Sequence, residues 1–239
     1  MRLAAKPDQV DVWRAAPRAL PEIKAMLTPD ELQRAARFHF EKDRRRFIAV
    51  RAWLREVLAC YLDTPPADLR FDYGAHGKPT LTRRSDLRFN LSHSHDLALL
   101  AVSKSRELGV DVEFMKEAVA GPEIAARFFS AAEAAELRGL PKEQQRAAFF
   151  AGWTRKEAYI KATGAGLFGA LDRFSVSLTP SDSRVSLRVH GDERETARWS
   201  LCSLDPGEGY AGALAVEGGD WRLRCLDWPQ EEAAPLTPK

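Results

Sequence analysis

The order of helical and strand-like segments repeats along this chain, and this repeat constrains the fold more than any other feature. Helical patterns followed by strand-like patterns occur twice along the sequence. The string ALLAV at 98–102 resembles GALAV at 212–216, late in each half. We therefore expect an α+β fold of two similar α/β halves related by pseudo-twofold symmetry, with an active site in the cleft between them. The expected boundaries are 1–106, 107–228 and a polar, disordered tail at 229–239.

Local patterns predict the main elements. Thr28, Pro29 and Glu31 form a helix start with a capping box. A second helix is expected from Asp43 to Leu62, because its apolar residues recur at helical spacing. Three arginines lie beside that apolar stripe: Arg44, Arg51 and Arg55. Strands are expected at 87–91, 97–102, 110–114, 174–178, 185–189, 199–204, 210–216 and 221–226. The strand at 110–114 is expected to form a hairpin with that at 97–102.

Composition excludes several classes of protein. The 239 residues include 36 Lys and Arg against 34 Asp and Glu, so the net charge favours neither nucleic acid nor a membrane as partner. Three scattered cysteines argue against a disulfide framework and a structural zinc site. The N-terminus has no signal-peptide pattern, and the longest aliphatic run, 97–102, is too short to span a bilayer. We expect a cytoplasmic protein.

Two carboxylates in the segment GVDVE, at 109–113, indicate a metal site. Side chains alternate along a strand, so Asp111 and Glu113 share one face and repel each other unless a cation or a proton lies between them. Hard oxygen ligands of this kind suit Mg²⁺. A half-exposed strand with a solvated polar face would also explain the pattern.

The longest helix is expected at 142–162, followed by Gly164 and Gly166. Glu157 and Lys161 are four residues apart and lie side by side on it, either as a functional pair or as a surface ion pair. Lys156 projects about 100° away from Glu157. Its long side chain can still bend toward a shared anion.

A third group of residues can bind phosphate. Gly77, Lys78 and Pro79 form one loop, and Ser92 and His93 lie in the segment NLSHS after a strand. Lysine, serine and histidine all donate hydrogen bonds to phosphate oxygens. A serine next to a histidine is more often turn chemistry, and no acid is placed to make a hydrolase triad.

Taken in order, the motifs GKP, FNLSHS, GVDVE and WTRKEAYIKATGAGL resemble the 4′-phosphopantetheinyl transferase superfamily, specifically its long, monomeric, Sfp-type branch. They span residues 77–167. The resemblance implies transfer of the 4′-phosphopantetheine arm of coenzyme A to a serine of an apo carrier protein, with release of 3′,5′-ADP. It also implies a divalent cation, Mg²⁺ or Mn²⁺, and an acidic, helical carrier as partner. It does not choose between fatty-acid, polyketide and nonribosomal-peptide carriers.

The resemblance assigns roles to individual residues. Asp111, Glu113 and Glu157 match the metal carboxylates, and Glu157 also matches the general base. The positions that match contacts to coenzyme A are Gly77, Lys78, Pro79, Ser92, His93, Asp111 and Lys161, with Lys156 a further candidate. Arg51 resembles the helix arginine that meets the 3′-phosphate, and Arg34 fits a second basic contact best, with Arg37 as the alternative. Lys161 would stabilise charge on the leaving phosphate.

Other functions remain compatible with parts of the pattern. Another Mg²⁺-dependent enzyme acting on a phosphate-rich cofactor is one, although no G-x-x-x-x-G-K-[ST] loop is present. A non-catalytic coenzyme A sensor would keep the phosphate contacts but would not need three carboxylates. The basic edge Arg44–Arg46 either steers an acidic carrier toward the enzyme or only solubilises the helix.

Overall fold

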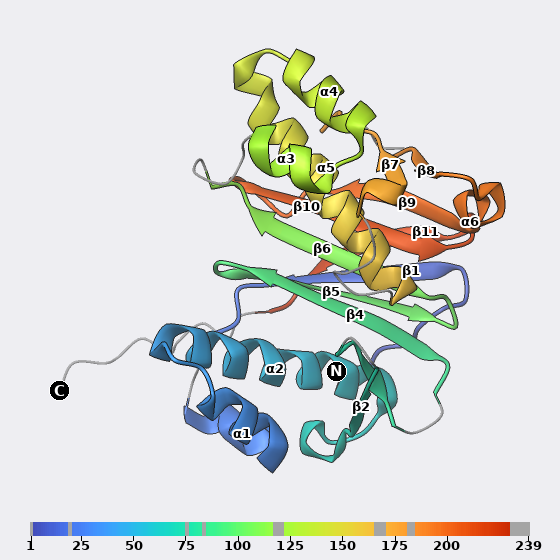
Figure 1. The fold of residues 1–239 in the computed structure, drawn as a ribbon. Coiled ribbons are helices and arrows are strands. Elements are labelled where there is room, and N and C mark those ends of the chain that lie inside the picture. The colour runs from blue at the N-terminus through green and yellow to red at the C-terminus, as the bar shows by residue number, and fades with distance from the viewer. Residues whose placement is uncertain are drawn as a thin grey trace.

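Two long helices enclose two β-sheets, which gives the molecule four layers (Figure 1). A computed structural model describes residues 2–18, 21–74, 77–82, 85–116, 122–164, 171–180 and 185–229. The first sheet has the order β11-β1-β5-β4, with strands Arg222–Asp227, Gln9–Ala15, Leu97–Lys104 and Leu87–Ser94. The second has the order β6-β10-β9, with strands Leu108–Phe114, Tyr210–Glu217 and Trp199–Leu204. Helix α2 (Glu41–Leu62) covers the first sheet and α5 (Lys142–Thr163) the second.

Shorter elements complete each half. The further α-helices are α1 (Pro29–Ala36), α3 (Pro122–Phe128), α4 (Ala131–Gly139) and α6 (Glu193–Arg198). The 3-10 helices are η1 (Pro21–Met26), η2 (Pro66–Asp68) and η4 (Leu171–Arg173). The remaining strands form two small antiparallel pairs, β2 (Phe71–Tyr73) with β3 (Pro79–Leu81) and β7 (Phe174–Val176) with β8 (Leu187–Val189). The predicted helix start at Thr28 is confirmed, since Glu31 accepts the Thr28 backbone N–H at 3.0 Å.

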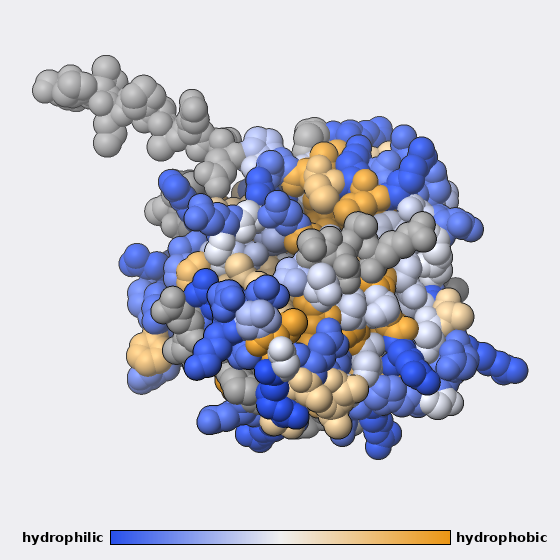
Figure 2. All heavy atoms as spheres, turned by 90° about the horizontal axis from the view of Figure 1, so that it is seen from above, coloured by the Kyte–Doolittle hydropathy of each residue, from blue (hydrophilic) through white to orange (hydrophobic). Residues whose placement is uncertain are grey.

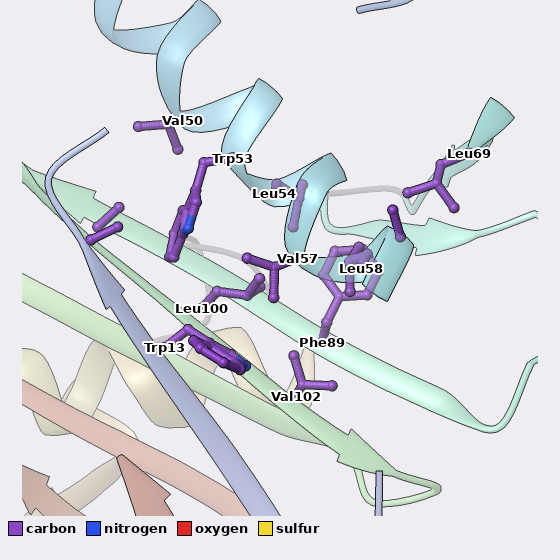
Figure 3. Packing of buried hydrophobic residues seen from close by; sticks show 13 residues of the cluster. Trp13, Val50, Trp53, Leu54, Val57, Leu58, Leu69, Phe89, Leu100 and Val102 are labelled. Atoms are coloured by element: carbon purple, nitrogen blue, oxygen red, sulfur yellow. The ribbon is translucent and has the colours of Figure 1, made fainter. Parts of the chain in front are cut away.

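The apolar stripe of α2 packs on the first sheet, as its spacing predicts. Leu54, Val57 and Leu58 are fully buried and meet the side chains of Phe89, Leu100 and Val102, among others (Figure 3). Each such side chain contributes roughly 1.5–3 kcal/mol on burial. This packing fixes α2, and with it Arg51 and Arg55, relative to β4 and β5.

The two sheets face each other across a second apolar layer. Alternate residues of β1, β5, β6 and β10 form it, including Val12, Leu99, Val110 and Leu214. Because Val110 and Val112 face this layer, Asp111 and Glu113 face away from it, toward α5. Viewed from above, hydrophilic side chains surround a band of hydrophobic ones (Figure 2). No helix in the described part of the chain is long and apolar enough to cross a membrane.

The structure confirms the expected α+β fold with two α/β halves, and it corrects one strand pairing. The expected hairpin between 97–102 and 110–114 is wrong: β5 pairs with β4 and β1, whereas β6 pairs with β10. The chain leaves one sheet and enters the other at residues 105–107, where Ser105 has a φ of 70°. A short polar turn between two apolar strands does not reveal that crossing.

The last strand returns to the first sheet. β11 lies parallel to β1, and Arg224 donates two hydrogen bonds to the buried carboxylate of Asp11, at 2.8 and 2.7 Å. Thus 222–227, expected within the second half, completes the sheet of the first. The similar strings at 98–102 and 212–216 both lie in central strands, but Leu100 faces α2 whereas Leu214 faces the layer between the sheets. The expected tail at 229–239 lies outside the described residues after Pro229.

Candidate active site

Strands β4 and β6 meet edge to edge between the halves, and side chains join them. The N–H groups of Val110, Val112 and Phe114 donate to Asn90 Oδ1 (2.9 Å), Ser92 Oγ (3.3 Å) and Ser94 Oγ (3.0 Å), respectively. An edge strand normally leaves such groups unpaired. The motif NLSHS therefore closes the seam between the two sheets, in addition to the phosphate-binding role that the sequence suggests.

Glycine at 109 lets α5 approach β6 closely. A Cβ atom there would lie 2.1 Å from the carbonyl oxygen of Ala158 and 2.3 Å from the backbone nitrogen of Ala162. Any side chain would therefore push the helix away. The close approach brings Glu157 and Lys161, the neighbours of these two alanines, to the face of β6 that carries Asp111.

Asp111 is buried and held by two partners. Its Oδ1 accepts hydrogen bonds from Ser92 Oγ (2.8 Å) and Lys161 Nζ (2.6 Å), and Lys161 Nζ also lies 2.9 Å from Ser92 Oγ. Ser92 accepts from the N–H groups of Val112 and Lys161, so its single proton points to Asp111. Three elements thus meet at one carboxylate: β4, β6 and α5.

Glu113 and Glu157, the other two predicted metal carboxylates, interact electrostatically with Asp111. Burial, together with the charge of Asp111, raises the pKa of Glu113, although a hydrogen bond from Ser94 Oγ (2.6 Å) opposes this. Burial raises the pKa of Glu157 to about 7, with further contributions from the negative charges of Asp111 and Glu113, against the lowering effect of Lys161. These mutual effects place the three carboxylates in one cluster of charge.

The donor set of this cluster fits a hard divalent cation. Asp111 Oδ2 and Glu157 Oε1 are buried, and among the described residues they have no hydrogen-bond partner. Unsatisfied buried carboxylate oxygens are costly unless a proton or a cation meets them. As the side chains stand, no three His, Cys, Asp or Glu residues in the described chain are grouped closely enough to hold a metal ion. Binding one would therefore require a change of side-chain rotamer. Glu157 has the freedom for it, because its Oε1 has no partner among the described residues, whereas Ser94 holds Glu113.

Two basic residues of the first half lie near Lys161 and the end of α5. His93, on β4, is exposed at the surface, yet desolvation by the atoms around it and the charges of Lys161 and Arg46 lower its pKa. Lys78, which directly precedes β3, donates from its Nζ to Glu107 (3.4 Å) and to the backbone carbonyls of Leu108 (3.3 Å) and Ala162 (3.2 Å). Because the Ala162 carbonyl belongs to the last turn of α5, Lys78 ties the first half to the end of that helix.

Lys156 corrects one prediction. Its side chain is fully buried and forms an ion pair with Glu133 at 2.8 Å. Its Nζ also donates to the carbonyls of Leu171 (2.8 Å) and Phe174 (2.7 Å). These partners lie on the side of α5 away from Asp111, as the helical spacing requires, so Lys156 supports the second half and its predicted contact with phosphate is wrong.

The predicted contacts for the 3′-phosphate lie on α1 and α2. Arg34 is exposed, with its guanidinium 5.5 Å from the centre of the Phe47 ring. Arg51 is buried, donates to Glu31 at 2.5 Å, and also donates to the hydroxyl of Tyr73. Its partner Glu31 additionally binds Arg55 at 2.8 Å. Both 3′-phosphate contacts stay predictions.

Loop residues of the predicted coenzyme A site lie beside Tyr73. Gly77 has a φ of 77°, which favours glycine, and its N–H donates to the carbonyl of Gly74 at 2.9 Å. Pro79 begins β3. Gly166, predicted to follow the long helix, lies outside the described residues, whereas Gly164 caps α5 with a φ of 72°.

Sequence reasoning missed Ser94 and Glu31 as parts of this region. Ser94 is two residues after Ser92 and so faces the same side of β4, a spacing that already indicated a shared role. Glu31 was assigned only to the capping box. Nothing in the sequence around it shows that it also neutralises two arginines of the next helix.

Comparisons with known proteins agree with the motifs. Residues 107–215 match a family model described as the 4′-phosphopantetheinyl transferase superfamily, and residues 11–105 match one described as 4′-phosphopantetheinyl transferase, N-terminal. The 4′-phosphopantetheinyl transferase HetI of a Nostoc species is 42% identical over 90% of this chain and 90% of its own. The 4′-phosphopantetheinyl transferase Sfp of Bacillus subtilis is 32% identical over 77% of this chain and 80% of its own. The human L-aminoadipate-semialdehyde dehydrogenase-phosphopantetheinyl transferase is 30% identical over 88% of this chain and 73% of its own. The chain belongs to the 4′-phosphopantetheinyl transferase superfamily.

Proposed function

We propose that this chain transfers the 4′-phosphopantetheine arm of coenzyme A to a serine hydroxyl of an apo carrier protein and releases 3′,5′-ADP, with a divalent cation as cofactor. Membership of the superfamily supports the transfer. The observation that carries the mechanism is the position of Glu157, a buried carboxylate that interacts with the charges of Asp111 and Lys161 and whose Oε1 has no hydrogen-bond partner among the described residues. A carboxylate oxygen without a partner is placed to accept a proton from a hydroxyl group.

Asp111, Glu113 and Glu157 would hold the cation, Mg²⁺ or Mn²⁺. When bound, it would supply positive charge that offsets the charge of the pyrophosphate of coenzyme A. Asp111 Oδ2 and Glu157 Oε1, which have no hydrogen-bond partner in the described part of the chain, support this role. A cation would also relieve the repulsion by Asp111 and Glu113, which adds to the effect of burial in raising the pKa of Glu157.

Residues of the chain itself carry the remaining steps. Glu157 takes the proton of the acceptor serine, whose oxygen then forms a bond to the phosphorus that carries pantetheine. The bond from that phosphorus to 3′,5′-ADP breaks, and Lys161 stabilises the negative charge that develops on the leaving phosphate. Lys161 would have to exchange part of its contact with Asp111 for the substrate.

Coenzyme A would lie along the cations and loops of the first half. We assign its phosphates to Lys78, Ser92, His93 and Lys161, its adenine end to Gly77 and Pro79, and its 3′-phosphate to Arg34 and Arg51. The basic edge Arg44–Arg46, in which Arg44 and Arg45 are exposed, would attract an acidic carrier. Both halves of the site come from one chain, which supports action as a monomer, and we propose the cytoplasm as its location.

The test is to mix the protein with coenzyme A, Mg²⁺ and an apo carrier, and to measure the intact mass of the carrier. A gain of one phosphopantetheine is the expected result, and it should disappear with a chelator. Binding of coenzyme A without any gain would instead support a sensor. Glu113→Gln should abolish the Mg²⁺-dependent gain while the melting temperature stays near that of the wild type, and unchanged turnover would refute the metal role of Glu113.

A further inference from the structure

Three side chains of β4 perform the same task at the seam, but only two of them also touch a carboxylate. Asn90, Ser92 and Ser94 each accept one backbone N–H of β6. Ser92 and Ser94 in addition donate to Asp111 Oδ1 and Glu113 Oε2, at 2.8 and 2.6 Å. Asn90 lies two residues before Ser92 on the same face of β4, and among the described residues its side chain is hydrogen-bonded to the backbone of β6 and to no carboxylate.

The two hydrogen bonds of Ser94 determine where its hydroxyl proton points. A serine hydroxyl has one proton to donate and can accept at its lone pairs. The N–H of Phe114 is a donor only, so the hydroxyl accepts there, and its proton goes to Glu113 Oε2. At 2.6 Å this is a short, charge-assisted hydrogen bond, of the kind that is stronger than one between neutral groups.

Ser94 itself is held firmly. It is the last residue of β4, and the next residue, His95, has a φ of 53° and stacks its ring on Phe114 at 4.9 Å between centroids. Phe114 in turn contacts Tyr210 edge to face at 5.2 Å. The strand end, the turn and the neighbouring strand thus form one packed unit around the hydroxyl.

We propose that Ser94 is a positioning residue that fixes the carboxylate of Glu113 for the cation, an inference that rests on the proposed function. A glutamate side chain has three rotatable bonds, and binding a cation through it requires those bonds to be ordered. Ser94 orders them beforehand by holding one oxygen. Hydrogen bonds to metal-ligating side chains raise metal affinity in this way, and their loss typically costs 10–100-fold.

The experiment compares Ser94→Ala, Ser94→Thr and Asn90→Ala in the full chain. Binding of Mn²⁺ is measured directly by its electron paramagnetic resonance signal, and the concentration of Mg²⁺ for half-maximal transfer is measured in the carrier assay. Ser94→Ala should weaken both by about tenfold. Ser94→Thr keeps the hydroxyl and suits a strand, so it should restore both to within about threefold of the wild type.

Asn90→Ala is the matched control, because it removes a seam hydrogen bond without touching a carboxylate. It should lower the melting temperature and leave the dissociation constant for Mn²⁺ unchanged. The proposal is overturned if folded Ser94→Ala binds Mn²⁺ as the wild type does, if Asn90→Ala weakens binding equally, or if the wild type binds no Mn²⁺. A wild type that binds Mn²⁺ but transfers nothing would instead remove the proposed function and leave the positioning role intact.

Discussion

Glu31 and Glu157 are both buried glutamates, yet their surroundings shift their pKa values in opposite directions. Glu31 is 2% exposed and meets the guanidinium groups of Arg51 and Arg55 at 2.5 and 2.8 Å. Burial alone would raise its pKa, but the hydrogen bonds from Arg55, from the Thr28 backbone and from Arg51 hold that pKa below its ordinary value. Glu157 is 7% exposed, and burial raises its pKa to about 7. Its Oε1 has no hydrogen-bond partner among the residues that the structure describes.

The difference separates a structural carboxylate from a chemical one. In the first half, two guanidinium groups compensate the buried carboxylate of Glu31, and these contacts hold α1, α2 and the strand of Tyr73 together. In the second half, negative charge is concentrated and only partly compensated by Lys161. Unsatisfied groups of this kind cost stability and persist where a ligand meets them. The comparison therefore predicts opposite consequences for the same substitution at the two sites.

Glu157→Gln should produce the largest effect, a fall in turnover of roughly 10³-fold, because it removes the proposed base and one metal ligand. The melting temperature of the metal-free protein should stay the same or rise, since the substitution removes a buried charge that is repelled by Asp111 and Glu113. Transfer to the carrier and thermal unfolding measure the two effects. A stable variant with full activity would contradict the comparison.

Glu31→Gln should act in the opposite direction, mainly on stability. It leaves Arg51 and Arg55 buried beside a neutral amide, and breaking a buried ion pair in this way costs roughly 3 kcal/mol of unfolding free energy. Denaturant unfolding measures that loss. At saturating coenzyme A, the turnover rate of the folded fraction should stay within a few fold of the wild-type rate. If Glu31→Gln instead abolished chemistry in a well-folded protein, Glu31 would belong to the active site.

Local sequence patterns predict the carboxylate cluster around Glu157, but they do not predict which residues form buried ion pairs. Strand alternation places Asp111 and Glu113 on one face, and helical spacing places Glu157 beside Lys161; both patterns are local. Helical spacing also indicates that Lys156 points elsewhere, yet only the tertiary fold shows that Glu133 receives it.

Strand pairing is the other part that local patterns do not determine. The hydrophobic alternation of 108–114 predicts a strand but not its neighbours, because β5 and β10 both offer an apolar strand of similar length. The partner β10 lies about a hundred residues later in the chain, and β11 crosses back to pair with β1. Pairings of this separation depend on the packing of the whole fold rather than on the turn that joins two strands.

The pH dependence of stability should sharpen the contrast between the two glutamates. The pKa of Glu157 is raised from 4.5 to about 7 in the folded protein. Such a carboxyl group does not lower the free energy of unfolding below pH 4.5, where it is protonated in both states. Above pH 7 it lowers the free energy of unfolding by its full amount, at most roughly 3 kcal/mol. The unfolding free energy of chelator-treated wild type should therefore fall from pH 4.5 to 7 relative to Glu157→Gln. Glu31 has the reverse sign: its contribution is present above its unfolded pKa and is lost as the pH falls through its lower folded pKa. If the curves of unfolding free energy against pH were parallel for the wild type and Glu157→Gln, ionised Glu157 would not destabilise the folded protein.

Arg34 and Arg51 provide the smallest and most selective test, because compensation also differs between these two cations. Arg51 is committed to Glu31, whereas Arg34 is exposed and contacts only the ring of Phe47 among the interactions described for it. A cation free of a carboxylate has more to gain from a phosphate. Arg34→Ala should therefore raise the KM for coenzyme A about tenfold, or roughly 1.4 kcal/mol, while the KM for 3′-dephospho-coenzyme A changes little. Arg34→Lys, which keeps the charge, should recover part of the loss. An equal change for both substrates would exclude a contact between Arg34 and the 3′-phosphate and leave Arg51, despite its pairing with Glu31, as the residue to test next.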